Sequence, residues 1–142
     1  MVDSATKFHD PDETRSFLGG RARIVALRNF SDARGTLVPF EFAALSFQPR
    51  RAFLVQSVPA GTVRGGHAHA SGQQLLLCLC GRLLVRLSFE GSTASVELSG
   101  ASEGLIIDAG VWSEQLYVAP DTRVLVLASE PYDPGGYLDH PG

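Results

Sequence analysis

The sequence Gly61-Thr62-Val63-Arg64-Gly65-Gly66-His67-Ala68-His69 carries the pattern from which the fold can be predicted. One residue separates His67 from His69, and alternate side chains of an extended strand point to the same face. The two imidazoles are therefore predicted to project side by side. The glycines before them permit a bend and a close approach to the backbone.

An apolar run, Gln74-Leu75-Leu76-Leu77-Cys78-Leu79-Cys80, follows the histidines and ends at Gly81. Its length and composition predict a buried strand. Cys78 and Cys80 are the only cysteines of the chain. Their side chains would run parallel on one face of the strand, which suits a disulfide poorly. We interpret both as small apolar core residues.

Short apolar segments recur about every 8–12 residues along the rest of the chain, with turn signals between them, as is typical of an all-β sandwich or barrel. The other predicted strands cover residues 23–27, 36–42, 51–58, 83–87, 94–98, 104–108, 115–118 and 123–129. Pro39 indicates a sheet edge for the second of these. We expect residues 1–22 to be a loosely ordered lead-in and residues 23–142 to be one β-barrel domain.

The composition argues against several classes of protein. A chain of 142 residues is long enough for one domain with its own core, and 44% hydrophobic residues argue against disorder. A formal net charge of −3 argues against a general nucleic-acid binder. No apolar run approaches the roughly 20 residues of a membrane span, and the polar N-terminus lacks a signal-peptide core. We therefore expect a cytoplasmic protein that binds neither nucleic acid nor a membrane.

The spacing of the histidine stretch resembles the first signature of the cupins. Gly61, His67, His69 and Gly81 fit that signature, whereas Gln74 stands at the position of the metal-binding glutamate. The resemblance implies an all-β, single-domain cupin jelly-roll barrel.

The second cupin signature is present only in part. Gly110 fits it, but Asp108 stands at the proline position and Ser113 at the histidine position. The chain therefore resembles a cupin that has lost half of its metal site, and we expect it to need no metal.

Further motifs extend the resemblance from about Ile24 to Tyr137. They are Asp32 to Leu37, Arg64 to His69 with Gln74, Gly104 with Val111, Trp112 and Glu114, and Leu127 to Ser129 with Tyr132, Asp133 and Tyr137. In this order they resemble the nucleotide-sugar 3,4-ketoisomerases, cupins that act on dTDP-4-keto-6-deoxyglucose. The family usually has histidine where this chain has Ser113.

The chemistry of such an isomerase suits two adjacent histidines. A base removes the proton on C3, an enediol forms, and a proton is delivered to C4, so that no redox cofactor is needed. Histidine titrates near neutral pH, as this base must. We predict that His67 and His69 are the catalytic residues, with His69 as the base, and that the enzyme uses no cofactor.

Six residues are predicted to bind the substrate, a dTDP-linked keto-deoxysugar: Arg64, Arg51, Gln74, Ser113, Arg34 and Tyr132. The Gln74 amide can donate to a sugar oxygen, and a guanidinium forms paired hydrogen bonds with a diphosphate. Arg34 is explained equally well as a turn residue, and Tyr132 as a cap on the barrel.

Three alternatives remain open at this point. A metal-dependent cupin oxygenase or isomerase would need three or four ligands, of which only the two histidines are in place. A non-catalytic sugar-binding cupin is favoured by Ser113. The third is a related nucleotide-sugar epimerase. The resemblance also implies a homodimer that pairs the N-terminal strands, 23–27 and 36–42, because an open sheet edge favours pairing with another chain.

Overall fold

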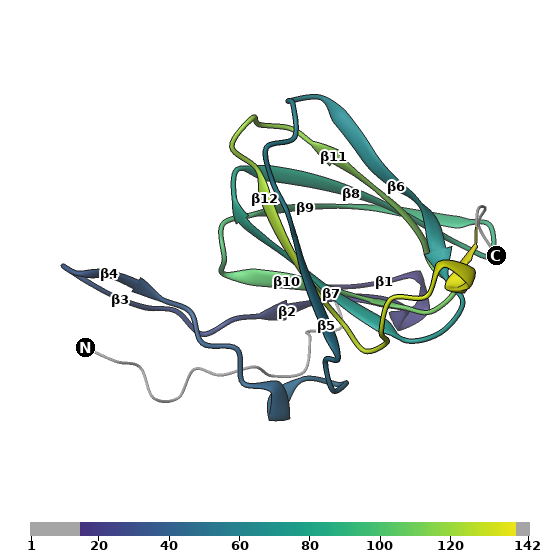
Figure 1. The fold of residues 1–142 in the computed structure, drawn as a ribbon, viewed down its shortest axis with the longest axis horizontal. Coiled ribbons are helices and arrows are strands. Elements are labelled where there is room, and N and C mark those ends of the chain that lie inside the picture. Colours follow the sequence, from purple (N-terminus) through teal and green to yellow (C-terminus); the bar gives the residue numbers. More distant parts are fainter. Residues whose placement is uncertain (1–14, 139–142) are drawn as a thin grey trace.

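The structure is a computed structural model that describes residues 15–138, and two antiparallel sheets face each other across a barrel (Figure 1). The helices among these residues are 3₁₀ turns: η2 (Leu18–Gly20), η3 (Phe42–Ala44) and η4 (Pro134–Gly136). None of the helices in the described part of the chain is long and apolar enough to cross a membrane.

The barrel is built from two sheets. In spatial order the larger sheet holds β1 (Ser16–Phe17), β2 (Ala22–Ala26), β10 (Glu103–Asp108), β7 (Gln73–Cys80), β12 (Arg123–Ala128) and β5 (Arg51–Val55). The smaller sheet holds β13 (Tyr137–Leu138), β6 (Thr62–His69), β11 (Trp112–Tyr117), β8 (Arg82–Phe89) and β9 (Ser92–Ser99). Because consecutive strands such as β6 and β7 lie in different sheets, the chain repeatedly crosses the barrel. This arrangement confirms the predicted all-β jelly roll.

Strand β7 is buried on both faces, which explains its unbroken apolar sequence. Leu76 and Cys78 belong to the core between the two sheets. Leu75 and Leu77 belong to a second cluster, which Val38, Phe40, Leu45 and Phe47 cover. The buried strand and the core assignment of Cys78 are thus confirmed. The core assignment of Cys80 is wrong, because Cys80 lies at the end of β7, is only half-buried and contacts Asp121. Burial raises the pKa of the Cys78 thiol to about 11, so that the thiol is unreactive at neutral pH.

The segment after β2 leaves the barrel as a separate two-stranded hairpin of β3 (Phe30–Asp32) and β4 (Gly35–Leu37), which projects away from the sheets (Figure 1). The predicted strand 36–42 is therefore wrong beyond Leu37, because residues 38–41 form no strand and η3 follows. Pro39 has no N–H for a sheet ladder. Val38 and Phe40 instead pack on the outer face of the larger sheet.

The ordered barrel begins earlier than residue 23. Strand β1 pairs with β2, Ala22 is fully buried, and Phe17 packs against the core. The part of the expected lead-in from residue 15 onward is therefore built into the barrel, whereas residues 1–14 lie outside the described residues. A strand of two residues has no periodicity that a sequence could reveal.

Candidate active site

A bulge on β6 decides which side chains face the inside of the barrel. The pairing of β11 with β6 skips one residue between Gly65 and His67. Gly65 and Gly66 have φ values of 87° and 84°, which side-chain-bearing residues rarely adopt. Because one inserted residue reverses the faces of the side chains that follow, Arg64 and His67 both point inward.

A cavity of about 220 Å³ opens between the two sheets, and we call it the inner cavity. Six of the predicted site residues line it: Arg51, Arg64, His67, His69, Gln74 and Ser113. Its apolar walls include Phe53, Leu76 and Val126. The fold therefore gathers side chains from β5, β6, β7 and β11 that lie far apart in the sequence.

The two histidines lie edge to face, with ring centroids 5.8 Å apart. They share one cavity, as their spacing predicts. Tyr137 contacts both rings, at centroid distances of 4.6 Å from His67 and 4.9 Å from His69. Our site prediction does not include Tyr137. The tail motif of the resemblance contains it, but only the pairing of β13 with β6 brings it to the histidines.

The surroundings of His69 favour the neutral form of its imidazole. Burial lowers the pKa of His69 below its usual 6.5, and the nearby charges of His67 and Arg51 lower that pKa further. A hydrogen bond to the Gln74 side chain opposes this shift. The Gly110 N–H donates to the His69 carbonyl oxygen at 2.8 Å, which fixes the backbone. A neutral imidazole held in place is the form that accepts a proton.

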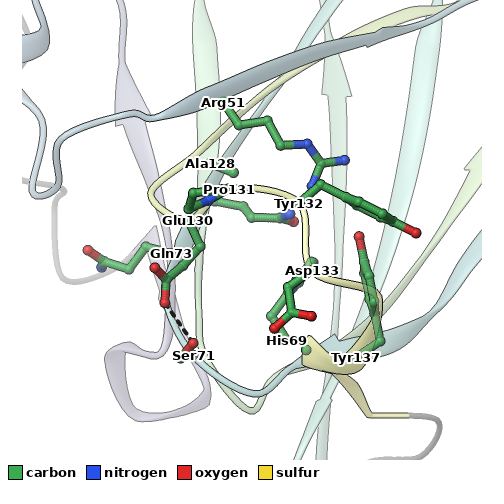
Figure 2. A pocket seen from close by; sticks show the side chains of 12 residues that line it. Arg51, His69, Ser71, Gln73, Ala128, Glu130, Pro131, Tyr132, Asp133 and Tyr137 are labelled. Atoms are coloured by element: carbon green, nitrogen blue, oxygen red, sulfur yellow. Dashed lines mark hydrogen bonds between the residues drawn. The ribbon is translucent and has the colours of Figure 1, made fainter.

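A second pocket of about 250 Å³ adjoins the inner cavity, and we call it the outer pocket (Figure 2). Arg51, His69, Gln74 and Tyr137 line both spaces. The Arg51 guanidinium lies 4.5 Å from the centroid of the Phe53 ring and 5.0 Å from that of Tyr132. The predicted residue Tyr132 thus lines the outer pocket beside a cation, not the inner cavity.

Arg34 is not in either space. It lies in the turn of the β3–β4 hairpin, where its guanidinium forms an ion pair with Asp32 at 2.5 Å and its side chain is 89% exposed. Arg34 lowers the pKa of the Asp32 carboxyl by hydrogen bonding to it. Within one protomer the structure therefore does not bring Arg34 to the histidines.

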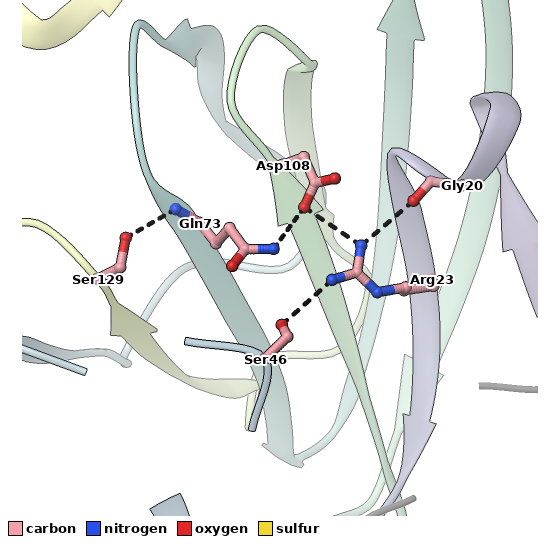
Figure 3. Close-up of polar contacts among 6 residues, drawn as sticks. All are labelled: Gly20, Arg23, Ser46, Gln73, Asp108 and Ser129. Carbon is pink, nitrogen blue, oxygen red and sulfur yellow. Dashed lines mark hydrogen bonds and ion pairs between the residues drawn. The ribbon is translucent and has the colours of Figure 1, made fainter. Parts of the chain in front are cut away.

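A network of polar side chains on the outer face of the larger sheet fixes the start of β7, next to the cavity (Figure 3). Asp108 accepts from the Gln73 side chain at 2.7 Å and from Arg23 at 3.2 Å. Arg23 also donates to Ser46, in the segment that returns from the hairpin to the barrel. Gln73 precedes Gln74, so the network anchors the start of β7 next to the cavity. The sequence gives no signal for it beyond the unusual aspartate at a cupin proline position.

The side chains around the histidines are poor ligands for a metal ion. Gln74 and Ser113 line the inner cavity where a metal cupin has glutamate and histidine. Across residues 15–138, no three side chains of the His, Cys, Asp and Glu types gather as a metal site. The described residues therefore do not fit a cupin metal centre.

Comparison with known proteins identifies the family of the chain. The family model described as "FdtA: WxcM-like, C-terminal" matches residues 21–141. The TDP-4-oxo-6-deoxy-α-D-glucose-3,4-oxoisomerase of Aneurinibacillus thermoaerophilus is 29% identical over 117 residues, 82% of this chain and 84% of that protein.

Two solved enzymes have the same fold. The sugar 3,4-ketoisomerase QdtA of Thermoanaerobacterium thermosaccharolyticum, in complex with TDP, is 30% identical with a TM-score of 0.81, over 84% of this chain and 88% of that one. A histidine-to-asparagine variant of QdtA is known in complex with TDP-4-keto-6-deoxyglucose. The TDP-quinovose 3,4-ketoisomerase WlaRB of Campylobacter jejuni is 28% identical with a TM-score of 0.79, over 84% and 92% of the two chains. The chain therefore belongs to the FdtA-like family of cupin barrels.

Proposed function

We propose that the protein is a 3,4-ketoisomerase that converts dTDP-4-keto-6-deoxyglucose into the 3-keto isomer. One observation carries the proposal: a single cavity is lined by two histidines and two arginines, and burial lowers the pKa of one of the histidines, His69. The names of the relatives support the same substrate and reaction.

In this proposal His69 is the base. Its neutral imidazole takes the proton from C3, whose acidity the adjacent carbonyl raises. The resulting enediol has oxygens on C3 and C4. His67 moves the hydroxyl proton, so that O4 gains a hydrogen and O3 loses one, and the imidazolium of His69 then delivers a proton to C4. Protons balance over the cycle, and no electron acceptor is needed.

The remaining side chains bind and orient the substrate. The Gln74 amide donates to a sugar oxygen, and Ser113 contacts the sugar beside His67. Arg51 and Arg64 bind the diphosphate, since both residues line the inner cavity and a guanidinium forms paired hydrogen bonds with phosphate oxygens. Tyr132 stands at the outer pocket, within reach of the nucleotide.

We further propose a homodimer in the cytoplasm. The β3–β4 hairpin, which carries Arg34 in its turn, projects from its own barrel (Figure 1), and in such a dimer it would reach the second subunit. Cys78 and Cys80 are free thiols, which suits a reducing compartment.

The experiment is incubation with dTDP-4-keto-6-deoxyglucose in D₂O, followed by NMR of the sugar. The 3-keto product, with solvent deuterium at C3 or C4, is the expected result. The alternative function is that of a non-catalytic sugar-binding protein. The observation that favours it is Ser113, which lines the cavity where the family usually has histidine. Tight binding without isomerisation or deuterium uptake would establish that alternative and reject the isomerase.

A further inference from the structure

Gln115 is a cavity residue that the sequence does not single out. It lies two residues after Ser113 on β11, so both side chains point into the inner cavity. The Gln115 amide nitrogen donates to the Ser113 hydroxyl oxygen at 3.2 Å, and both residues are half-buried.

The bulge on β6 makes the space that this amide occupies. A Cβ atom on Gly65 would lie 2.8 Å from the Gln115 amide oxygen and 3.1 Å from the Ser113 carbonyl oxygen. The first distance is shorter than real Cβ atoms tolerate. The absence of a side chain at Gly65 therefore leaves room for the Gln115 amide beside the backbone of β6, where its nitrogen is bonded to Ser113.

The hydrogen bond also orients the Ser113 hydroxyl. Its oxygen accepts from Gln115, so its own proton is free to be donated elsewhere. Neither group gains or loses a proton near pH 7, in contrast to the histidine that the family usually has at this position. The pair is suited to binding an oxygen atom and not to moving a proton.

The position of Ser113 identifies the part of the ligand that it meets. Ser113 pairs directly with His67 across the two strands, and such facing residues have Cβ atoms about 4.5–5.5 Å apart. Gln115 faces Arg64, the proposed diphosphate ligand. An oxygen that contacts Ser113 is therefore an oxygen of the hexose, close to the carbons that the histidines serve.

We infer that Gln115 is a positioning residue that determines specificity for the hexose, because it aims the Ser113 hydroxyl at a sugar oxygen. The inference rests on the proposed function for the identity of the ligand. It predicts that Gln115 strengthens binding of the sugar part without affecting binding of the nucleotide part.

The test compares two ligands that do not react, TDP and TDP-6-deoxyglucose, by titration calorimetry. Gln115→Met keeps the length of the side chain but removes the hydrogen bond. We expect this variant to bind TDP-6-deoxyglucose about five- to tenfold more weakly, as loss of one hydrogen bond does. Its affinity for TDP should be unchanged. Ser113→Ala should have the same effect, and the double variant should be no weaker than either single one. Gln48→Met, at an exposed glutamine, is the matched control.

Three results would overturn the inference: equal weakening of TDP and the sugar nucleotide, unchanged affinities in Gln115→Met, or additive losses in the double variant. The last result would mean that Gln115 acts independently of Ser113. Turnover of the keto sugar by the unmodified protein is measured separately. Its absence would reject the isomerase but would leave the affinity ratios, and therefore this inference, to be judged by themselves.

Discussion

The chemical character of His69 depends on its surroundings more than on its residue type. An exposed histidine would be partly protonated near neutral pH, and a protonated imidazole cannot act as a base. Burial inside the barrel favours the neutral form, and the charges of His67 and Arg51 add to this effect. Arg51, the proposed diphosphate ligand, therefore also favours the neutral form of His69 that can accept a proton.

This arrangement predicts the pH dependence of the reaction. Because the pKa of His69 is lowered, kcat/KM should stay high until the pH falls clearly below 6.5 and should decline only at lower pH. Arg51→Met removes a nearby positive charge, so the acidic limb of the profile should move to higher pH. Rate profiles of both proteins measure this shift. An Arg123→Met control, at an exposed position on β12, should leave the limb in place, and a fixed limb in Arg51→Met would contradict the prediction.

Replacement of the histidines tests their roles directly. His69→Asn should lower turnover by about 10²–10⁴-fold, the usual contribution of a general base, while TDP still binds and the barrel stays folded. His67→Asn should also lower turnover strongly. Product formation and deuterium uptake measure both variants. Near-wild-type turnover in both would mean that the His-x-His motif is only an inherited remnant of a metal site.

Sequence spacing could predict the residues that adjoin the histidines along the chain. Arg64, Gln74 and the histidine pair lie within one strand and its successor, so the motif alone brings them together. Tyr137 and Gln115 could not be found this way, because only the pairing of β13 and β11 with β6 carries them to the cavity. Arg34 is the converse case: it belongs to a motif, but its hairpin leads away from its own barrel (Figure 1), so the motif alone does not place it at the histidines of the same chain.

At the scale of elements, the β6 bulge couples the fold to the site. An Arg-Gly-Gly-His sequence allows two inward side chains that a regular strand would place on opposite faces. Strand β7 was predictable because burial on both faces leaves an unbroken apolar run. The strand predicted for residues 36–42 was not correct in full, since the alternation of Val38 and Phe40 reflects packing on a sheet face instead of pairing within it.

Two glycines with nearly equal φ values allow the stability of the bulge to be tested separately from its effect on activity. Gly66 and Gly91 have φ values of 84° and 83°, and neither would bring a Cβ into contact with other atoms. Gly66→Ala and Gly91→Ala should each cost about 1–2 kcal/mol in urea unfolding. Only Gly66→Ala should also lower turnover, because relief of the strain shifts His67 relative to Arg64. Equal turnover in the two variants would mean that the geometry of the bulge does not affect catalysis.

At the scale of the whole molecule, the barrel keeps the architecture of a cupin with only two of a cupin's metal ligands, His67 and His69. The prediction is that activity survives exhaustive chelation, because two imidazoles with an amide and a hydroxyl are a weak ligand set. Turnover is measured after dialysis against chelator, with metal analysis of the same sample. Loss of activity that one particular divalent metal restores would reverse this prediction.

At the scale of the whole molecule, the exposed β3–β4 hairpin favours dimerisation. A two-stranded hairpin is marginally stable alone, and β3–β4 leaves its barrel with Leu37 65% exposed. Pairing of the N-terminal strands with a second copy would cover this apolar side chain and the strand edge. We therefore expect a dimer by light scattering at micromolar concentration, which Leu37→Asp should shift toward monomer.

A matched control separates this contact from a general loss of solubility. Leu79→Asp places the same charge on β7, at a side chain that is 36% exposed and lies outside the hairpin, and should leave the dimer intact. If Arg34 contacts the substrate bound to the second subunit, the monomeric Leu37→Asp variant should also lose turnover. Arg34→Ala should lose turnover while light scattering still gives the mass of the dimer. A wild-type monomer at micromolar concentration would reject the dimer. The substrate role of Arg34 would then fail with it, because its own hairpin holds it away from its own cavity.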